Sequence, residues 1–264
     1  MSPARGGEDR EGPRHPTRDS PAADPFDVLL RHRLVVFDKD GTLIEFHAMW
    51  GGWAVELASD LETATHRSIR EPLFDALGVD WRTARILPHG ALAATPMSTL
   101  RAVAVDIVAR AGCPDGAAEA AVQAAWHPPD PVALAEPFTD LVALFEALRA
   151  AGTRVAVATT DDREPTERTM AALGLADLVD GTVCADDGLP VKPAPDMIEA
   201  LCDRLHVTAG DVALVGDSPA DLLMGRAARV RTTIGVLSGT GTTAELGPLA
   251  DLLLPSVAAF SVPS

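Results

Sequence analysis

The segment from Leu34 to Ile44, with the sequence LVVFDKDGTLI, constrains the fold of this chain more than any other segment. Its first four residues are apolar, which predicts a short strand in the interior of a parallel sheet. Asp38 and Asp40 follow where the strand ends, and residues two apart in an extended backbone point to the same side. Gly41 then allows a sharp turn, after which Thr42 supplies a hydroxyl. Such paired carboxylates suit a hard divalent cation and also nucleophilic or acid–base chemistry, although an ordinary Asp-Gly turn has the same local pattern.

After about residue 132, the sequence alternates between short apolar segments and segments with helical periodicity. This alternation predicts an α/β fold in which a Rossmann-like parallel sheet forms the core and helices cover both of its faces. The apolar segment described above joins the same sheet from earlier in the chain. The predicted strands are Arg154–Ala158, Thr182–Ala185, Val212–Val215 and, as the last, Thr232–Val236, and the predicted helices are Phe138–Ala150, Pro165–Leu173, Pro195–Leu205 and Pro219–Ala228.

Between Phe46 and Trp126 the pattern is helical throughout. Two adjacent glycines, Gly51 and Gly52, weaken the helix at the start of this region. We interpret the apolar stripe there as core packing rather than as a substrate site. The stripe consists of Trp50, Trp53, Leu57 and Leu61.

A second predicted helix, Ser98–Ala111, ends at a glycine, and the proline-rich link at 127–131 breaks any helix. Because the first strand precedes the helical region, the region is inserted into the sheet-forming part of the chain. We therefore predict an all-helical domain over residues 46–131 and an α/β core formed by residues 26–45 and 132–264.

The chain carries a formal net charge of −16 at pH 7, with a pI near 4.7. An acidic protein is disfavoured as a partner of nucleic acid or of an anionic membrane surface, because both require basic surface. No apolar run reaches the length of a membrane span. An anionic substrate must therefore meet a local positive group, either a metal ion or a few lysines.

Residues 1–25 are polar, rich in Pro, Gly, Arg and Asp, and lack the apolar segment of a secretory signal, so we expect a disordered tail. The three cysteines, Cys113, Cys184 and Cys202, lack the spacing of metal ligands, and their odd number fits a reduced compartment. These features predict a cytoplasmic protein, either a monomer or a homodimer.

In a parallel sheet of this kind, ligands bind at the carboxyl ends of the strands, which makes polar residues there candidates for a site. Thr159 and Thr160 follow one strand, where a hydroxyl can bind a phosphate oxygen, although a threonine-rich turn can equally cap the next helix. Lys192 lies between two prolines and is one of very few lysines in a chain whose basic residues are mostly arginine. A point-charge ammonium suits a phosphoryl group, with a surface lysine as the simpler alternative.

Two further carboxylates follow the strand Val212–Val215, in the segment GDSPAD. Asp217 comes after its strand as Asp38 comes after the first one. Asp221 lies one helical turn later and also suits a helix start, where the helix dipole favours negative charge. Polar groups thus follow four successive strands, in the order carboxylate pair, hydroxyl, lysine and second carboxylate pair. Together these groups indicate a functional site more strongly than any single group does.

This arrangement resembles the haloacid dehalogenase-like (HAD) hydrolase superfamily. The four motifs of that superfamily match here as DKDGT at 38–42, Thr159, Lys192 in VKPAPD, and GDSPAD at 216–221. The resemblance covers residues 33 to 256 and is greatest for the phosphoglycolate-phosphatase-like branch, in which a helical cap follows the first motif. It implies that residues 46–131 are such a cap, and the irregular loop at 88–98 is placed to select the substrate.

The resemblance implies a Mg²⁺-dependent phosphatase that acts on a small phosphorylated metabolite, a phosphate monoester similar to phosphoglycolate. In that chemistry Asp38 attacks phosphorus and becomes an aspartyl phosphate. Asp40 protonates the leaving alcohol and then activates water. Mg²⁺ offsets the repulsion between an anionic nucleophile and an anionic substrate.

The ligand set that the resemblance implies has two parts. Mg²⁺ is held by the Asp38 carboxylate, the Asp40 backbone carbonyl and the Asp217 carboxylate, with Asp221 as an outer or variable ligand. The phosphoryl oxygens are held by Thr159, Thr160 and Lys192.

Two residues depart from the pattern of the superfamily, and alternatives to the phosphatase remain open. Thr160 stands where asparagine is frequent, and Lys39 stands where relatives are often apolar; strand alternation turns the Lys39 side chain away from the metal. A sugar phosphomutase shares all four motifs. A non-catalytic interaction module predicts loss of the motif side chains, and none is missing. A dehalogenase is disfavoured because that chemistry dispenses with the second aspartate, whereas Asp40 is present.

Overall fold

A computed structural model describes residues 24–87, 90–95, 97–130, 132 and 135–260. The tail expected over residues 1–25 lies outside this range except for Asp24 and Pro25. These two residues cap and begin helix α1 (Pro25–Leu29), and the Asp24 carboxylate accepts a hydrogen bond of 2.9 Å from the backbone N of Phe26. The loop expected at 88–98 lies partly outside the described residues. Among the residues described, no helix combines the length and apolar character needed to cross a membrane.

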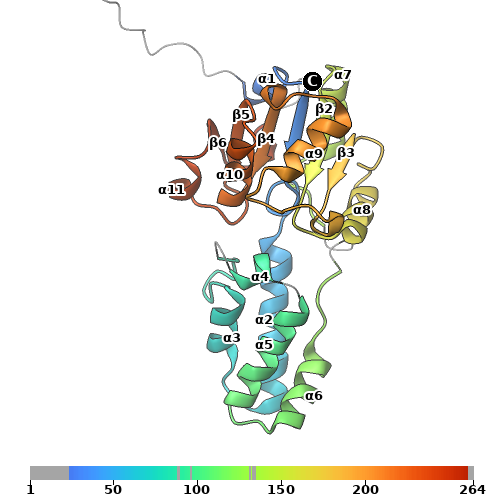
Figure 1. Ribbon diagram of the computed structural model, residues 1–264. Coiled ribbons are helices and arrows are strands. Elements are labelled where there is room, and N and C mark those ends of the chain that lie inside the picture. The colour runs from blue at the N-terminus through green and yellow to red at the C-terminus, as the bar shows by residue number, and fades with distance from the viewer. Residues whose placement is uncertain (1–23, 88–89, 96, 131, 133–134, 261–264) are drawn as a thin grey trace, which may run out of the picture.

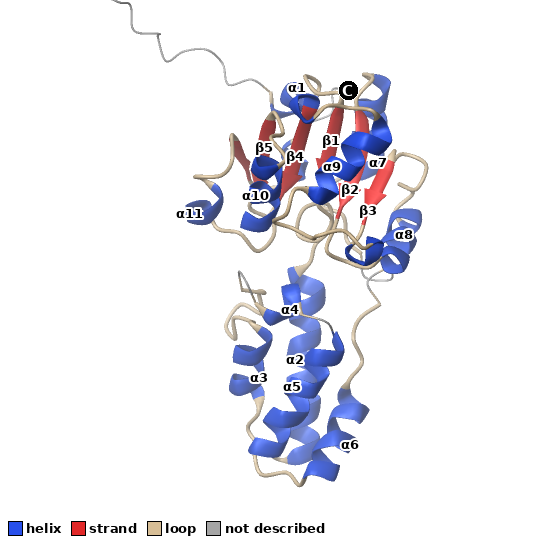
Figure 2. Ribbon diagram, in the orientation of Figure 1, coloured by secondary structure: helices blue, strands red, loops and turns tan. Residues whose placement is uncertain are grey.

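Six strands in the described part of the chain form one parallel sheet in the order β3-β2-β1-β4-β5-β6 (Figures 1 and 2). Their bounds are β1 Leu34–Phe37, β2 Arg154–Ala158, β3 Gly181–Val183, β4 Val212–Gly216, β5 Thr232–Val236 and β6 Leu252–Leu254. All four residues of β1 are buried between β2 and β4, as expected of a central strand. The sheet confirms the predicted α/β fold.

The prediction that Thr232–Val236 is the last strand was wrong, because β6 pairs in parallel with β5. Strand β6 has three residues, of which two are only partly buried, so it offers too short a pattern to be recognised in sequence. The helix predicted from Phe138 begins later, at Leu141. The Asp140 side chain accepts a hydrogen bond of 3.0 Å from the backbone N of Ala143, and this cap fixes the start of the helix.

Helices cover both faces of the sheet (Figure 2). On one face, Phe37 of β1 stacks on Phe145 of α7 with ring centroids 5.3 Å apart. On the other face, Val36 of β1 packs in a cluster with Met197 and Ile198 of α9. The α-helices around the sheet are α1, α7 Leu141–Ala150, α8 Arg163–Ala172, α9 Asp196–Leu205, α10 Pro219–Ala227 and α11 Thr243–Leu246, and the short 3₁₀ helices are Ala185–Asp187, Ala209–Asp211 and Val257–Ala259.

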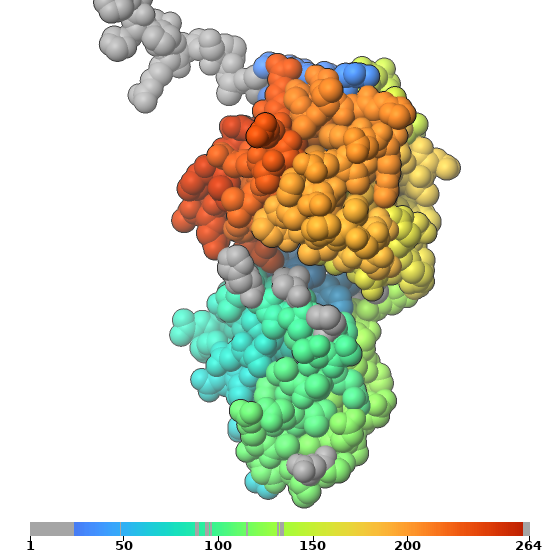
Figure 3. Space-filling model, in the orientation of Figure 1, coloured from blue at the N-terminus to red at the C-terminus, as the bar shows by residue number. Residues whose placement is uncertain are grey.

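In the described part of the chain, five helices between β1 and α7 lie beyond the carboxyl ends of the strands (Figure 1), and we call them the cap helices. They are α2 His47–Thr65, α3 Arg70–Leu77, α4 Ala91–Ala94, α5 Met97–Arg110 and α6 Asp115–Ala125. They enclose a hydrophobic core of their own, and the space-filling view shows them as a second lobe next to the lobe that contains the sheet (Figure 3). Trp53 is 5% exposed and packs edge-on against Trp50 and Trp126, which confirms that the tryptophan stripe is core.

One of the two glycines that weaken α2 in sequence, Gly51, has a packing reason. A Cβ atom on Gly51 would lie 1.8 Å from the carbonyl oxygen of Ala84, so only glycine allows α2 to approach that turn.

A buried histidine joins the cap helices to the loop after β5. The backbone N of Ile86 donates to His47 Nδ1 at 3.0 Å, so the ring proton is on Nε2, which donates to the Gly239 carbonyl at 2.8 Å. Arg85 Nη2 donates to the same carbonyl at 3.3 Å. Burial lowers the pKa of His47, which favours the neutral ring that this arrangement requires. These contacts hold the cap helices at the edge of the sheet where the strands end.

Candidate active site

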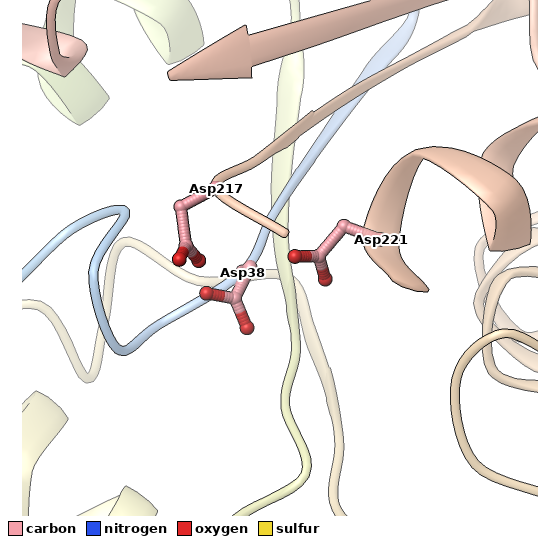
Figure 4. A group of neighbouring side chains, drawn as sticks. All are labelled: Asp38, Asp217 and Asp221. Carbon is pink, nitrogen blue, oxygen red and sulfur yellow. The ribbon is translucent and has the colours of Figure 1, made fainter. Parts of the chain in front are cut away.

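Three carboxylates meet where β1 and β4 end. Asp38 follows β1, Asp217 follows β4, and Asp221 comes from the first turn of α10. Each offers an oxygen within 4.8 Å of the others, and the residues are 6%, 4% and 1% exposed. Figure 4 shows the three side chains pointing toward one another from these separate segments. The topology therefore brings together two residues that the sequence placed at strand ends, Asp38 and Asp217, and one that it placed a helical turn later, Asp221.

Lys192 reaches the same cluster from the loop after β3. Its Nζ lies 2.5 Å from Asp38 Oδ1 and 2.5 Å from Asp221 Oδ1, and its side chain is 4% exposed. The alternative of a surface lysine is therefore excluded. The ammonium is placed to neutralise part of the buried negative charge beside Asp38.

The Asp221 side chain also serves its own helix. Ser218 and Asp221 form a capping box, in which the backbone N of Ser218 and its Oγ donate to Asp221 Oδ2 at 3.0 and 2.6 Å. One carboxylate oxygen thus stabilises the start of α10 and the other faces Lys192. Asp221 therefore caps α10, as the helix-start interpretation expects, and also lies in the carboxylate cluster.

Asp217 is held by a loop that sequence reasoning missed. The backbone N and Oγ1 of Thr240 donate to Asp217 Oδ2 at 2.7 and 3.2 Å, and Thr42 Oγ1 donates to Asp217 Oδ1 at 3.3 Å. Ser238 Oγ in the same loop donates to the Gly41 carbonyl at 2.7 Å. The signal in the sequence was the segment SGTG soon after β5, since a Gly-rich loop at the carboxyl end of a parallel strand is a candidate site segment.

The absence of a side chain at Gly239 creates the space for the Asp217 carboxylate. Adding one methyl group at residue 239 should therefore disturb the metal-binding cluster strongly. A Cβ atom at Gly239 would lie 1.9 Å from Asp217 Oδ2. We expect Gly239→Ala to displace that carboxylate and to raise the metal concentration needed for half-maximal phosphate release by about 10- to 100-fold, as for other residues that orient ligands. Gly210→Ala is the matched control, because a Cβ there has no atom within 4 Å. Wild-type metal dependence of Gly239→Ala would show that Asp217 does not need this loop.

Burial and mutual repulsion make two carboxylates of the cluster, Asp38 and Asp217, hard to ionise. Burial raises the pKa of Asp38 to about 6, opposed by Lys192 and reinforced by Asp221 and Asp40. Burial also raises the pKa of Asp217 well above its usual value, with Asp38 and Asp221 adding to the shift. Burial alone lowers the pKa of Lys192, but Asp221 and Asp38 raise it more, so the ammonium stays charged. The cluster thus contains three carboxyl groups and one ammonium, so it has room for a further positive charge.

The chemistry of these donors fits a hard divalent cation. Asp38, Asp217 and Asp221 provide carboxylate oxygens close enough to share one ion, and oxygen ligands of this kind suit Mg²⁺ or Ca²⁺. The Asp40 carboxylate is not part of this cluster. Its backbone carbonyl accepts no hydrogen bond among the described residues, so that oxygen is available as a further ligand.

The Asp40 side chain lies at the solvent boundary, near enough to Asp38 for its charge to raise the pKa of that carboxyl. Its carboxylate is 26% exposed and forms an ion pair of 2.8 Å with Lys39 Nζ. Lys39 turns away from Asp38, as strand alternation predicts, and also contacts Asp161 at 3.1 Å. Asp40 is thus accessible while Asp38 is not, which suits a proton donor or acceptor beside a buried nucleophile.

The two threonines after β2 occupy different environments. Thr159 is 1% exposed, and its Oγ1 accepts a hydrogen bond of 3.1 Å from the backbone N of Asp161, so its own hydroxyl proton remains free to donate. Thr160 is exposed, and among the described residues its side chain has no hydrogen bond. The geometry favours Thr159 over Thr160 as a group that holds a phosphoryl oxygen.

Comparison with known proteins gives a consistent result. Residues 32–229 match the family model described as haloacid dehalogenase-like hydrolase. The chain is 32% identical over 212 residues to the phosphoglycolate phosphatase of Rhodospirillum rubrum, an alignment that covers 76% of this chain and 78% of the relative.

Solved structures agree at the level of the fold. A HAD family hydrolase of Deinococcus radiodurans, solved with bound phosphate and sodium, superposes with a TM-score of 0.60 at 21% identity and covers 87% of this chain and 93% of its own. A proposed β-phosphoglucomutase of Thermotoga maritima superposes with a TM-score of 0.58 at 19% identity, covering 86% of this chain and 96% of its own.

Proposed function

The chain belongs to the haloacid dehalogenase-like hydrolases and is a phosphatase, and from that premise we propose that it hydrolyses a small phosphate monoester with Mg²⁺ as its cation. The observation that carries the proposal is the buried carboxylate Asp38, which lies beside Lys192 and two further carboxylates at the end of the central strand. A buried nucleophile next to a fixed ammonium suits attack on an anionic phosphoryl group.

In the proposed reaction, Asp38 attacks phosphorus through Oδ2, since Oδ1 is engaged by Lys192. The bond between phosphorus and the leaving oxygen breaks while a bond between Asp38 and phosphorus forms. Asp40 gives its proton to the leaving oxygen and then takes a proton from the water that hydrolyses the aspartyl phosphate. Lys192 and the Thr159 hydroxyl bind the phosphoryl oxygens, and the ammonium offsets the negative charge that gathers there.

Asp38, Asp217 and the Asp40 carbonyl are the proposed ligands of Mg²⁺, with Asp221 facing the same position from α10. When bound, the ion offsets the repulsion between the carboxylates and the phosphoryl group and polarises the phosphoryl oxygens. The fit of the donor set and the raised pKa values of Asp38 and Asp217 support this assignment.

We propose phosphoglycolate, or a monoester of similar size and charge, as the substrate. The name of the Rhodospirillum rubrum relative supports this choice. Arg85 adds support, because it is an exposed cation of the cap segment that contacts the loop beside Asp217 and forms no ion pair among the described residues. Such a cation suits a carboxylate on the substrate. The three cysteines are free, which supports a cytoplasmic location.

A phosphate-release screen tests this proposal. The purified chain is assayed with Mg²⁺ against a panel that contains phosphoglycolate, other alkyl phosphates, sugar phosphates, p-nitrophenyl phosphate and pyrophosphate. We expect the highest kcat/KM for phosphoglycolate or another small monoester that carries a carboxylate. Preference for pyrophosphate, or for large monoesters without a second anionic group, would replace the proposed substrate class.

A further inference from the structure

The chain uses lysine at two positions only, among 22 basic residues, and both lie at the candidate active site. The Lys39 and Lys192 side chains are 1% and 4% exposed. Lys192 is accounted for by its contacts with Asp38 and Asp221. Lys39 has no part in the reaction described above and calls for a separate explanation.

Lys39 binds two carboxylates on the accessible side of the site. Its Nζ lies 2.9 Å from Asp40 Oδ1, 2.8 Å from Asp40 Oδ2 and 3.1 Å from Asp161 Oδ2. The side chains of Asp40 and Asp161 are 26% and 33% exposed, whereas that of Lys39 is sealed from solvent. The ammonium therefore contacts both carboxylates from the protein interior. The solvent-facing parts of the two carboxylates are accessible to a ligand.

A buried ammonium is costly unless it is paired, and an apolar side chain of similar length would fill the same space without that cost. Burial alone lowers the pKa of Lys39, but Asp40 and Asp161 raise it more, so the group is a permanent positive charge. The Lys39 charge thus serves to bind the carboxylates of Asp40 and Asp161, since an apolar side chain would pack as well in the core.

The same ammonium joins the first strand end to the second. Asp161 belongs to the loop after β2, and its backbone N donates to Thr159 Oγ1 at 3.1 Å. Without Lys39, the carboxylates of Asp40 and Asp161 would repel each other across a short gap, and both loops would lose their common anchor.

We propose that Lys39 is a positioning residue, which fixes the carboxylate of Asp40 against the leaving group of the substrate by binding both of its oxygens from the buried side. The proposal rests on the proposed function, because it takes Asp40 as the proton donor. Its consequence is that Lys39 matters most for substrates whose leaving oxygen needs a proton.

Two substrates of different leaving group test this consequence. Lys39→Met is compared with wild type on phosphoglycolate, whose alkoxide needs a proton to leave, and on p-nitrophenyl phosphate, whose phenolate leaves without one. For phosphoglycolate we expect kcat/KM to fall by about 100-fold, which is in the range for loss of a general acid. For p-nitrophenyl phosphate we expect a fall of less than about threefold, because its leaving group needs no proton. Lys39→Arg keeps the charge, so we expect it to restore most of the loss for phosphoglycolate.

An equal fall in kcat/KM for both substrates, or no fall for either, overturns the proposal. Lys39→Gln is the second charge-removing variant if Lys39→Met does not fold, and thermal unfolding checks both. If neither variant folds, Lys39 is structural and the proposal is wrong. If wild type releases phosphate from no substrate, the proposed function itself fails and removes the basis of this inference.

A spectroscopic readout tests the Lys39–Asp40 contact without turnover. Labelling lysine with ¹⁵N at Nζ gives two ammonium signals in this chain, and Lys39→Met assigns them. We expect Asp40→Asn to shift the Lys39 signal and to leave the Lys192 signal in place. An unmoved Lys39 signal would show that the ammonium does not hold Asp40 in solution.

Discussion

Replacing Asp38 by asparagine is expected to lower phosphate release on the order of 10³-fold or more, because an amide is a far poorer nucleophile and metal ligand than a carboxylate. The protein should stay folded. The pKa of Asp38 is raised to about 6, so its stabilising contribution is present at low pH and lost as the pH rises through that value. At pH 7 in the absence of metal, the asparagine side chain therefore avoids the unfavourable ionisation of the buried Asp38 carboxyl. The Tm of Asp38→Asn should equal or exceed that of wild type.

Rapid-quench assays of phosphate release and thermal unfolding at pH 7 check both parts of this prediction. Asp203→Asn is a suitable control, since Asp203 is exposed on α9 and is not part of the carboxylate cluster among the described residues. Near-normal phosphate release by Asp38→Asn would exclude this residue as the nucleophile. A well-folded, inactive variant that no longer forms a phosphoenzyme would support its assignment.

Removal of divalent cations is expected to abolish phosphate release, and Mg²⁺ should restore it. The buried cluster contains three carboxylates and one ammonium, so binding of a phosphate dianion there is unfavourable without a further positive charge. Ca²⁺ should support turnover poorly or inhibit it, because its larger, more flexible coordination allows Asp38 to bind through both oxygens. Activity is measured after exhaustive chelation and again across a Mg²⁺ titration.

Binding of the cation is also visible without activity. A ligand that binds only the folded state raises Tm as its concentration increases, so Mg²⁺ should stabilise wild type. Asp217→Asn should lose most of this increase in Tm, whereas the Asp203→Asn control should retain it. Full activity after chelation, or an equal Mg²⁺-dependent increase in Asp217→Asn, would contradict the proposed ligand set.

The sequence predicted the part of the fold that depends on local pattern. Strand β2 was predicted with the bounds that it has, Arg154–Ala158, because four apolar residues after Arg154 follow a helix that ends at a glycine. The central position of β1 followed from its four consecutive apolar residues. The convergence of Asp38, Lys192 and Asp217 followed from a general property of parallel sheets, whose strand ends share one edge.

The remainder depends on contacts between segments that no local pattern encodes. Gly239 lies against Asp217 because the loop after β5 folds back over the end of β4, and the sequence gives no register for that loop. The contact between His47 and Gly239 joins residues far apart in the chain. Alternation along β1 predicts that Lys39 turns away from Asp38, but it cannot predict that Asp161 comes from another loop to meet it.

The distinction between a phosphatase and a phosphomutase concerns the group that accepts the phosphoryl from Asp38. A mutase passes it to a second sugar hydroxyl and needs cationic groups in the cap to hold a bisphosphate. Several arginines of the cap are instead paired with carboxylates of the cap itself. These are Arg70 with Glu62, Arg101 with Glu119 and Arg110 with Asp106. Such pairing removes three of the six cap arginines as free positive charge for a second phosphate.

The most direct test of phosphoryl transfer to water is to measure inorganic phosphate and hexose 6-phosphate side by side in Mg²⁺, with phosphoglycolate and with a hexose 1-phosphate as substrates. Transfer of the phosphoryl group to water predicts steady release of inorganic phosphate from phosphoglycolate, without a bisphosphate activator. Conversion of the hexose 1-phosphate to its 6-phosphate faster than inorganic phosphate is released would contradict the phosphatase and establish a mutase in its place.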